Sequence, residues 1–237
     1  MVPSQSLLML GVAVALAAVA ARPPQGRGGE TGRIEGTVRL SPTLASRKPR
    51  VHLYGDYGPG SVPPLPPSVT NEYANVVIYI DSVPAPDTTV SGHPTMAQQN
   101  ETFVPHVLPI VKGTTVAFPN DDPLFHNVFS LSAARSFDLG RYPKGTSKAV
   151  QFDRAGIVQV FCHIHADMSA IVVVLDNPFF TVPRAGHYAI DDVPPGDYRV
   201  VAWHERIKPI VEHAHVEPGR TTLVDLNVPL PPADARP

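Results

Sequence analysis

Residues 161–168 read Phe-Cys-His-Ile-His-Ala-Asp-Met and contain the only cysteine of the chain, Cys162. Val158, Val160 and Cys162 occupy alternate positions, so in a β-strand they share one face, and the thiol lies beside apolar neighbours. After a tight turn the chain continues into the apolar run 170–175, which predicts a second strand. We therefore expect a buried sulfur at the rim of a β-sandwich.

The same turn can bring Cys162, His165 and Met168 around one point, and His126, at the edge of an upstream predicted strand, can complete the set. Two imidazoles, one thiolate and a weakly bound thioether form a soft donor set that suits copper in a blue-copper electron-transfer centre. We predict one mononuclear site that alternates between Cu(I) and Cu(II). Because four protein ligands leave no position open for a substrate, we do not expect an enzyme.

The spacing Cys-x-x-His-x-x-Met, with Asn-Asp-x-x-x-x-His-Asn-Val upstream at 120–128, resembles the ligand loops of the cupredoxins, of the amicyanin and pseudoazurin type in particular. The wider stretch 96–175 resembles the plastocyanin-like methylamine utilization proteins. The matching pieces are Phe103-x-Pro105-His106-Val107, Phe137-Asp138-Leu139-Gly140, Tyr142-Pro143-x-Gly145 and Phe161-Cys162-x-Ile164-His165.

This resemblance implies a Greek-key β-sandwich that holds copper. It implies His126, Cys162 and His165 as equatorial ligands and Met168 as the axial ligand. It further implies that Asn127 hydrogen-bonds between the two ligand loops, an interaction that orients ligands without binding the metal.

Other interpretations of these residues stay open. Free cysteines are often inert core residues, and Met168 alone would usually be core packing. Zinc could occupy a Cys-His-His site, although copper is favoured over zinc at equal geometry. A cysteine hydrolase needs one histidine base and an orienting Asn or Asp, which leaves Met168 and the second histidine without a role.

Four further histidines need separate interpretation. His163 follows Cys162 directly, so we expect it to point outward or to lie beside the ligands without binding metal. For His106 we expect a structural role or a place next to the ligands. His213 and His215 share one face of a predicted strand, where solvated surface histidines are the usual finding.

The composition excludes an all-helical protein, and the strand pattern predicts an all-β one. Proline accounts for 28 of the 237 residues, a density that long helices do not tolerate. The net charge of −2 argues against a nucleic-acid-binding protein, which would carry a basic stripe. Short β-branched runs predict many strands, as in sandwiches and barrels; they cover 33–40, 75–81, 106–111, 114–118, 127–131, 147–153, 157–162, 170–175, 186–190, 198–204, 211–216 and 221–228.

A second β-sandwich is predicted around the first. The strand–turn–strand pattern at 186–200, with Pro195-Gly196 in the turn, resembles the carboxypeptidase regulatory-like, or transthyretin-like, module. We expect this module to be split between residues 32–92 and 179–231, with the cupredoxin domain inserted at 93–178. A cupredoxin preceded by a separate short N-terminal piece is the competing layout. Trp203 is expected in the core of the split sandwich, with an exposed contact as the alternative.

The N-terminus predicts export. Residues 7–21 are an apolar run that is too short for a membrane span and ends in Ala18-Val19-Ala20, as in a signal peptide covering 1–21. An N-terminal anchor helix is the alternative. We therefore expect the protein in the periplasm or outside the cell. Residues 58–68 and 83–94 are expected to be loops, and 232–237 a disordered tail.

Together these observations predict an electron carrier. The resemblance implies that electrons pass through the edge of His165, the ligand nearest the surface in that family, and apolar neighbours such as Ala166 and Pro123 would form a docking patch. Redox proteins would dock by transient contacts below about 1,200 Å², and a membrane-bound electron-transfer complex is a further candidate partner. The alternatives are a copper carrier or sensor, and a secreted structural or carbohydrate-binding protein that works through the second sandwich.

Overall fold

The computed structural model describes residues 30–41, 71–81, 83, 92–165 and 167–229. Over these ranges the chain is all-β, as predicted, and its helical structure is the 3₁₀ turn η1 (Glu72–Asn75). The predicted signal peptide, the loop 58–68, most of the loop 83–94 and the tail 232–237 lie outside the described residues. In the described part, no helix has the length and apolar character that a membrane crossing requires.

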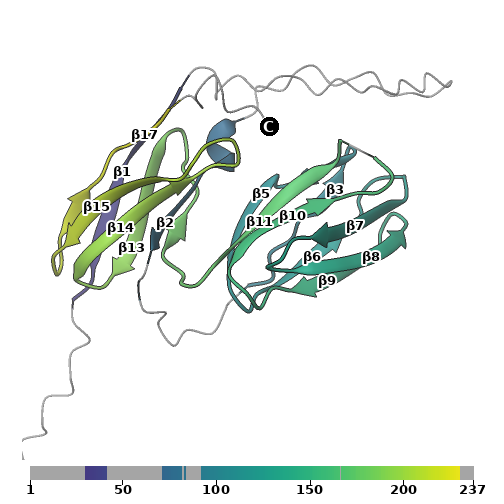
Figure 1. Ribbon diagram of the computed structural model, residues 1–237, viewed down its shortest axis with the longest axis horizontal. Coiled ribbons are helices and arrows are strands. Elements are labelled where there is room, and N and C mark those ends of the chain that lie inside the picture. The colour runs from purple at the N-terminus through teal and green to yellow at the C-terminus, as the bar shows by residue number, and fades with distance from the viewer. Residues whose placement is uncertain (1–29, 42–70, 82, 84–91, 166, 230–237) are drawn as a thin grey trace, which may run out of the picture.

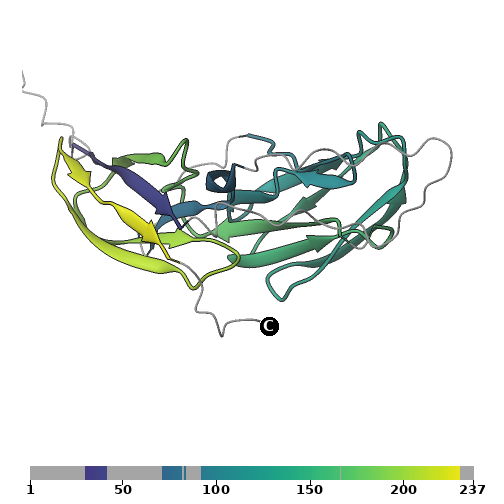
Figure 2. The same cartoon turned by 90° about the horizontal axis from the view of Figure 1, so that it is seen from above.

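The strands form two groups that lie side by side along the long axis of the molecule (Figures 1 and 2). We call the group made from both ends of the chain the terminal sandwich; it contains β1 (Gly32–Leu40), β2 (Val77–Asp81), β12 (Phe180–Thr181), β13 (His187–Val193), β14 (Gly196–Trp203), β15 (Ile210–Val216), β16 (Thr221–Leu223) and β17 (Leu226–Val228). We call the other group the central sandwich; it contains β3 (Ala97–Gln99), β4 (Thr102–Val104), β5 (Val107–Val111), β6 (Thr115–Pro119), β7 (His126–Leu131), β8 (Ser136–Tyr142), β9 (Ser147–Gln151), β10 (Gly156–Phe161) and β11 (Ser169–Leu175).

The central sandwich is built on a five-stranded sheet in the order β5-β11-β10-β7-β8. β5 runs parallel to β11, and the other neighbours are antiparallel. The pairs β6-β9 and β3-β4 supply the opposite layer. Side chains from both layers form one core; among them are Met96, Phe118, Val128, Phe152, Val158, Val160, Cys162 and Met168.

β11 is buried on both of its faces, which explains its continuous apolar run. Ala170, Val172 and Val174 point into the core of the central sandwich. Ile171 and Val173, together with Leu175, point to the opposite side, where they meet the terminal sandwich.

The contact between the sandwiches is an apolar cluster of its own. It consists of Val77, Val107, Ile171, Val173, Leu175 and Trp203, with Tyr79 and Phe180 packed against it. Trp203 was expected inside the split sandwich, and that expectation is wrong: it lies between the two sandwiches. Its position at the end of β14 explains the difference, because alternation sends Ala202 into the terminal core and Trp203 to the other face.

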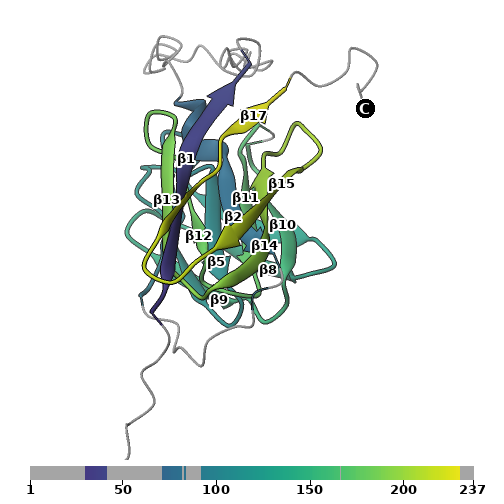
Figure 3. The same cartoon turned by 90° about the vertical axis from the view of Figure 1, so that its left-hand side faces the viewer.

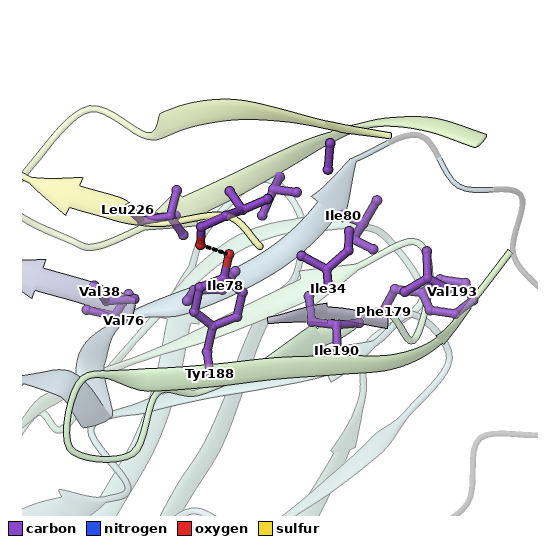
Figure 4. Packing of buried hydrophobic residues seen from close by; sticks show 14 of the residues in the cluster. Ile34, Val38, Val76, Ile78, Ile80, Phe179, Tyr188, Ile190, Val193 and Leu226 are labelled. Carbon is purple, nitrogen blue, oxygen red and sulfur yellow. Dashed lines mark hydrogen bonds between the residues drawn. The ribbon is translucent and has the colours of Figure 1, made fainter. Parts of the chain in front are cut away.

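In the terminal sandwich, β1 and β13 lie opposite the sheet β12-β2-β14-β15 (Figure 3). Figure 4 shows the apolar side chains between these layers, with the hydroxyl of Tyr188 donating to the carbonyl of Val224 at 2.7 Å. β1 also pairs with β16 and β17, both parallel to it. The chain passes so close to Gly36 that an added Cβ would lie 1.8 Å from the Val224 oxygen, so only glycine fits there.

Several strands differ from the prediction. The prediction missed four strands. Three of them, β3, β4 and β12, have three residues or fewer, and the fourth, β8, exposes most of its side chains. The predicted strand 221–228 is two strands, since Val224 and Asp225 leave the pairing to contact β1 at Glu35 and Thr37. The other predicted strands are present within a few residues of the expected bounds.

Candidate metal centre

Three potential metal ligands meet in the central sandwich. The Sγ atom of Cys162 lies 3.9 Å from Nδ1 of His126 and 3.9 Å from Nδ1 of His165, and the two nitrogens are 3.1 Å apart. Among the described residues this is the one group of three or more His, Cys, Asp or Glu side chains that could hold a metal ion. The structure therefore brings together three of the four predicted ligands.

The spacing of the three atoms matches a metal ion. A triangle with sides of 3.9, 3.9 and 3.1 Å has a centre about 2.1 Å from each corner, which is the length of a metal–nitrogen bond. A thiol and two imidazoles are soft and intermediate donors, a set suited to copper or zinc. The residues present thus fit a transition-metal ion by both spacing and chemistry.

Strand ends position two of the three candidate ligands, and the turn after β10 positions the third. His126 is the first residue of β7 and is fully buried, and Cys162 directly follows β10. The turn after Cys162 is closed by two backbone hydrogen bonds: Cys162 N–H donates to the Met168 carbonyl at 3.1 Å, and Met168 N–H donates to the His165 carbonyl at 3.0 Å. This closure places the Cys162 and His165 side chains on the same side of the turn.

Met168 is buried, with 1% of its surface exposed, and it belongs to the same core cluster as Cys162. Its backbone closes the ligand turn, as described above. Its position is consistent with either core packing or a fourth ligand, so its role as axial ligand stays a prediction.

Asp122 is a site residue that the sequence analysis missed. Its Oδ2 lies 2.8 Å from Nε2 of His126, and both side chains are buried. A carboxylate on the far nitrogen of a metal-binding histidine is a frequent arrangement in metal sites. The signal was present in the sequence as an acidic residue four positions before His126, but Asp121 beside it is acidic too, and the sequence does not show which of the two contacts the histidine.

Asn127 makes a different contact from the one that the resemblance implied. Its Nδ2 donates to Oδ1 of Asp138 at 2.7 Å and so ties β7 to β8, instead of joining the two ligand loops. Hydrogen bonds from the Gly140 amide and from Asn127 hold the pKa of Asp138 below its ordinary value. Asn127 pairs with β8, and the pairing of β7 with β8 contains a bulge between residues 127 and 129. The contact with Asp138 lies beside this bulge.

The four other histidines singled out in the sequence analysis lie outside the cluster. His163 is exposed, and its ring is 3.7 Å from that of Phe129, so it points away from the buried thiol. His106 lies between the sandwiches, where Nδ1 is 3.0 Å from the Ser169 carbonyl oxygen. His213 and His215 are on the exposed face of β15.

Apolar side chains reach solvent beside the cluster. Leu124, Phe125 and Ile164 are 44%, 58% and 38% exposed, and they line a shallow pocket together with Arg141, His163 and His165. Pro123, predicted as part of a docking patch, is also exposed, whereas Ala166 lies outside the described residues. His165 is thus the candidate ligand that borders an apolar surface.

Comparison with known proteins gives structural neighbours only. No protein-family model matches the chain, and no curated protein matches it. A purple cupredoxin from Nitrosopumilus maritimus is 23% identical and aligns over 35% of this chain and 99% of its own length, with a TM-score of 0.32. The reduced state of an amicyanin mutant is 22% identical over 41% of this chain and 98% of its own, with a TM-score of 0.33.

A copper-containing nitrite reductase from Thermus scotoductus SA-01 is also similar. It is 25% identical and aligns over 39% of this chain with a TM-score of 0.34, but this covers 25% of the reductase. Likenesses with TM-scores this low do not assign a function, so the function has to come from the geometry of the site.

Proposed function

We propose that this chain binds one copper ion with His126, Cys162 and His165, with Met168 as a weaker fourth ligand, and carries single electrons between redox proteins. The observation that carries the proposal is the meeting of two imidazole nitrogens and one thiol sulfur around a point about 2.1 Å from each. Bound copper would supply one-electron chemistry by alternating between Cu(I) and Cu(II), both of which this donor set accommodates.

The way the ligands are held supports an electron carrier. Asp122 fixes the ring of His126, and two backbone hydrogen bonds close the turn that carries Cys162 and His165. Ligands on such short, bonded loops move little when the charge of the ion changes. Little reorganisation favours fast electron transfer, and four protein ligands would leave no open position for a substrate. We therefore propose a carrier and not an enzyme.

The surface beside His165 supports docking of a protein partner. The side chain of His165 is 22% exposed, and the apolar residues Leu124, Phe125 and Ile164 surround it. A small apolar patch suits brief contacts that bury less than about 1,200 Å². We propose other redox proteins as partners, including a membrane-bound electron-transfer complex.

We further propose that the chain works in the periplasm or outside the cell, after export by the leader at 1–21. A lone thiol in an oxidising compartment is protected when it is buried and bound to metal, and Cys162 is a buried free cysteine. The terminal sandwich, from 32–92 and 179–231, would be a carboxypeptidase regulatory-like spacer or docking module. The cupredoxin domain at 93–178 would carry the chemistry.

The test is to load the purified protein with Cu(II) and record its visible spectrum. We expect the intense thiolate-to-copper absorption of a blue site, one copper per chain, and its loss in Cys162→Ser. Met168→Gln should keep the absorption but shift it. The matched control is His163→Ala, which removes the adjacent exposed histidine and should leave the spectrum unchanged.

Redox cycling separates the electron carrier from its alternatives. A carrier keeps its copper through repeated reduction and oxidation. Release of copper on reduction would favour a copper carrier or sensor, and tight zinc binding without a coloured copper form would contradict the proposal. A Cys162→Ala variant that keeps its biological role would favour a structural or carbohydrate-binding protein.

A further inference from the structure

Asp122 is a buried carboxylate that N–H groups approach from several directions. Its Oδ1 accepts the amide of Asn100 at 2.5 Å, and its Oδ2 accepts the amide of Glu101 at 2.9 Å. The same Oδ2 lies 2.8 Å from Nε2 of His126. Because a carboxylate only accepts hydrogen bonds, the imidazole must donate in this contact. His126 therefore carries its proton on Nε2.

The two amides come from a hairpin turn outside the ligand loops. Asn100 and Glu101 connect β3 to β4, and their φ angles are 52° and 55°. A two-residue hairpin turn with both central φ values positive is the type I′ turn, which is common with Asn and unusual with Glu. This geometry aims both N–H groups at Asp122. The hairpin is also bonded to the ligand loop through the Gln98 carbonyl, which accepts Asp121 N–H at 3.0 Å.

The contact with Asp122 determines how His126 faces the site. A neutral imidazole has one donor nitrogen and one acceptor nitrogen. With Nε2 donating to Asp122, the lone pair of Nδ1 is directed toward the Cys162 sulfur and the second histidine. A flip of the ring would break the contact with Asp122 in a fully buried position.

We propose that Asp122 is a positioning residue that directs the Nδ1 lone pair of His126 at the metal and, through its negative charge, favours Cu(II) over Cu(I). This inference rests on the copper binding proposed above. A carboxylate on the far nitrogen makes the imidazole a stronger electron donor, and replacing such partners changes metal affinity about 10- to 100-fold. A stronger donor stabilises the more highly charged ion, so Asp122 should lower the reduction potential.

The decisive comparison is Asp122→Asn against Asp121→Asn. Both substitutions remove one negative charge from the same loop. Asp121 is exposed and its side chain accepts from Nε2 of Gln99 at 2.9 Å, without contact to a ligand histidine. Asp122→Asn should raise the affinity for Cu(I) relative to Cu(II) about tenfold, a potential about 59 mV more positive, measured by spectroelectrochemical titration.

The control variant Asp121→Asn should shift the potential much less. Equal shifts of the reduction potential in the two variants would overturn the inference, because they would show that Asp122 acts only as a negative charge in the same loop. A shift of Asp122→Asn toward more negative potential would overturn it as well.

A second measurement needs no variant. Nitrogen-15 NMR of the metal-free wild-type protein should show His126 with its proton on Nε2 and slow exchange of that proton. A proton on Nδ1 would overturn the positioning role, even if Asp122→Asn fails to fold. If the wild-type protein develops no thiolate-to-copper absorption, the proposed function fails. The tautomer of His126, measured on the metal-free protein, then decides by itself whether Asp122 positions the His126 ring.

Discussion

His106 of the central sandwich and Glu205 of the terminal sandwich meet across their interface, with Nε2 of the imidazole 3.2 Å from each carboxylate oxygen. The other ring nitrogen of His106 lies 3.0 Å from the Ser169 carbonyl oxygen, where β11 begins directly after the ligand turn. Next to this contact lies the apolar cluster that contains Trp203. The terminal sandwich thus packs against the strand that leaves the candidate metal site.

Trp203→Ala tests whether the two sandwiches share this cluster in solution. The side chain is 9% exposed, and truncating a buried aromatic residue should lower the free energy of unfolding by about 3–5 kcal/mol. Urea unfolding followed by circular dichroism measures the loss. The control is Leu131→Ala, at 80% exposure, which should change stability by less than about 0.5 kcal/mol. Equal effects would contradict a shared core.

Tyr142→Phe tests a buried polar contact close to the ligand loop. The hydroxyl donates to the Phe118 carbonyl at 2.9 Å and accepts from Nε2 of Gln98 at 2.7 Å, and burial raises its pKa. Its removal leaves both partners without this contact, so stability should fall by about 1–3 kcal/mol. The control is Tyr198→Phe. The hydroxyl of Tyr198 makes no hydrogen bond among the described residues, so its removal should not lower the stability comparably.

The sequence predicted the parts of this structure that depend on local pattern. Alternation at Val158, Val160 and Cys162 predicted a strand face and a buried thiol, and both are confirmed. The apolar run 170–175 predicted a strand, but not that its second face is covered by another sandwich. Periodicity shows that a face is apolar, whereas the partner that covers it is set by tertiary packing.

The contacts around the candidate ligands were harder to predict for the same reason. Asp122 orients His126 because a hairpin distant in sequence supplies the two amides that hold it. Neither Asn100 nor Glu101 belongs to any motif that the ligand spacing defines. Similarly, the bond from Asn127 to Asp138 depends on a bulge between β7 and β8, and β8 itself has too many exposed residues to be recognised as a strand.

Asp225→Asn tests the pH dependence of the terminal sandwich. Oδ1 of Asp225 accepts both the hydroxyl and the amide of Thr37, and these bonds hold the pKa of Asp225 below its ordinary value of 3.8. In the window just below pH 3.8 the unfolded chain therefore binds more protons than the folded chain, so stability rises with pH. The contribution is present above pH 3.8 and is lost as pH falls through the lowered pKa.

The variant keeps an acceptor oxygen but not the charge, so it should be less stable than the wild type at pH 7. The difference should shrink at pH 3, as measured by thermal unfolding at both pH values. A difference that stays constant between the two would show that the charge of Asp225 contributes nothing.

Phe125→Ser tests whether electrons leave through the apolar surface beside His165. Phe125 is 58% exposed next to this ligand, so the substitution should leave the spectrum and potential of the copper form unchanged while weakening encounters between molecules. We expect electron self-exchange between the Cu(I) and Cu(II) forms, measured by NMR line broadening, to slow by about tenfold, within the usual range for interface variants. The matched control is Leu131→Ser, which removes an exposed apolar side chain at the far end of β7 and should leave self-exchange unchanged. If Leu131→Ser slows the exchange as much as Phe125→Ser, the contact surface lies elsewhere on the central sandwich.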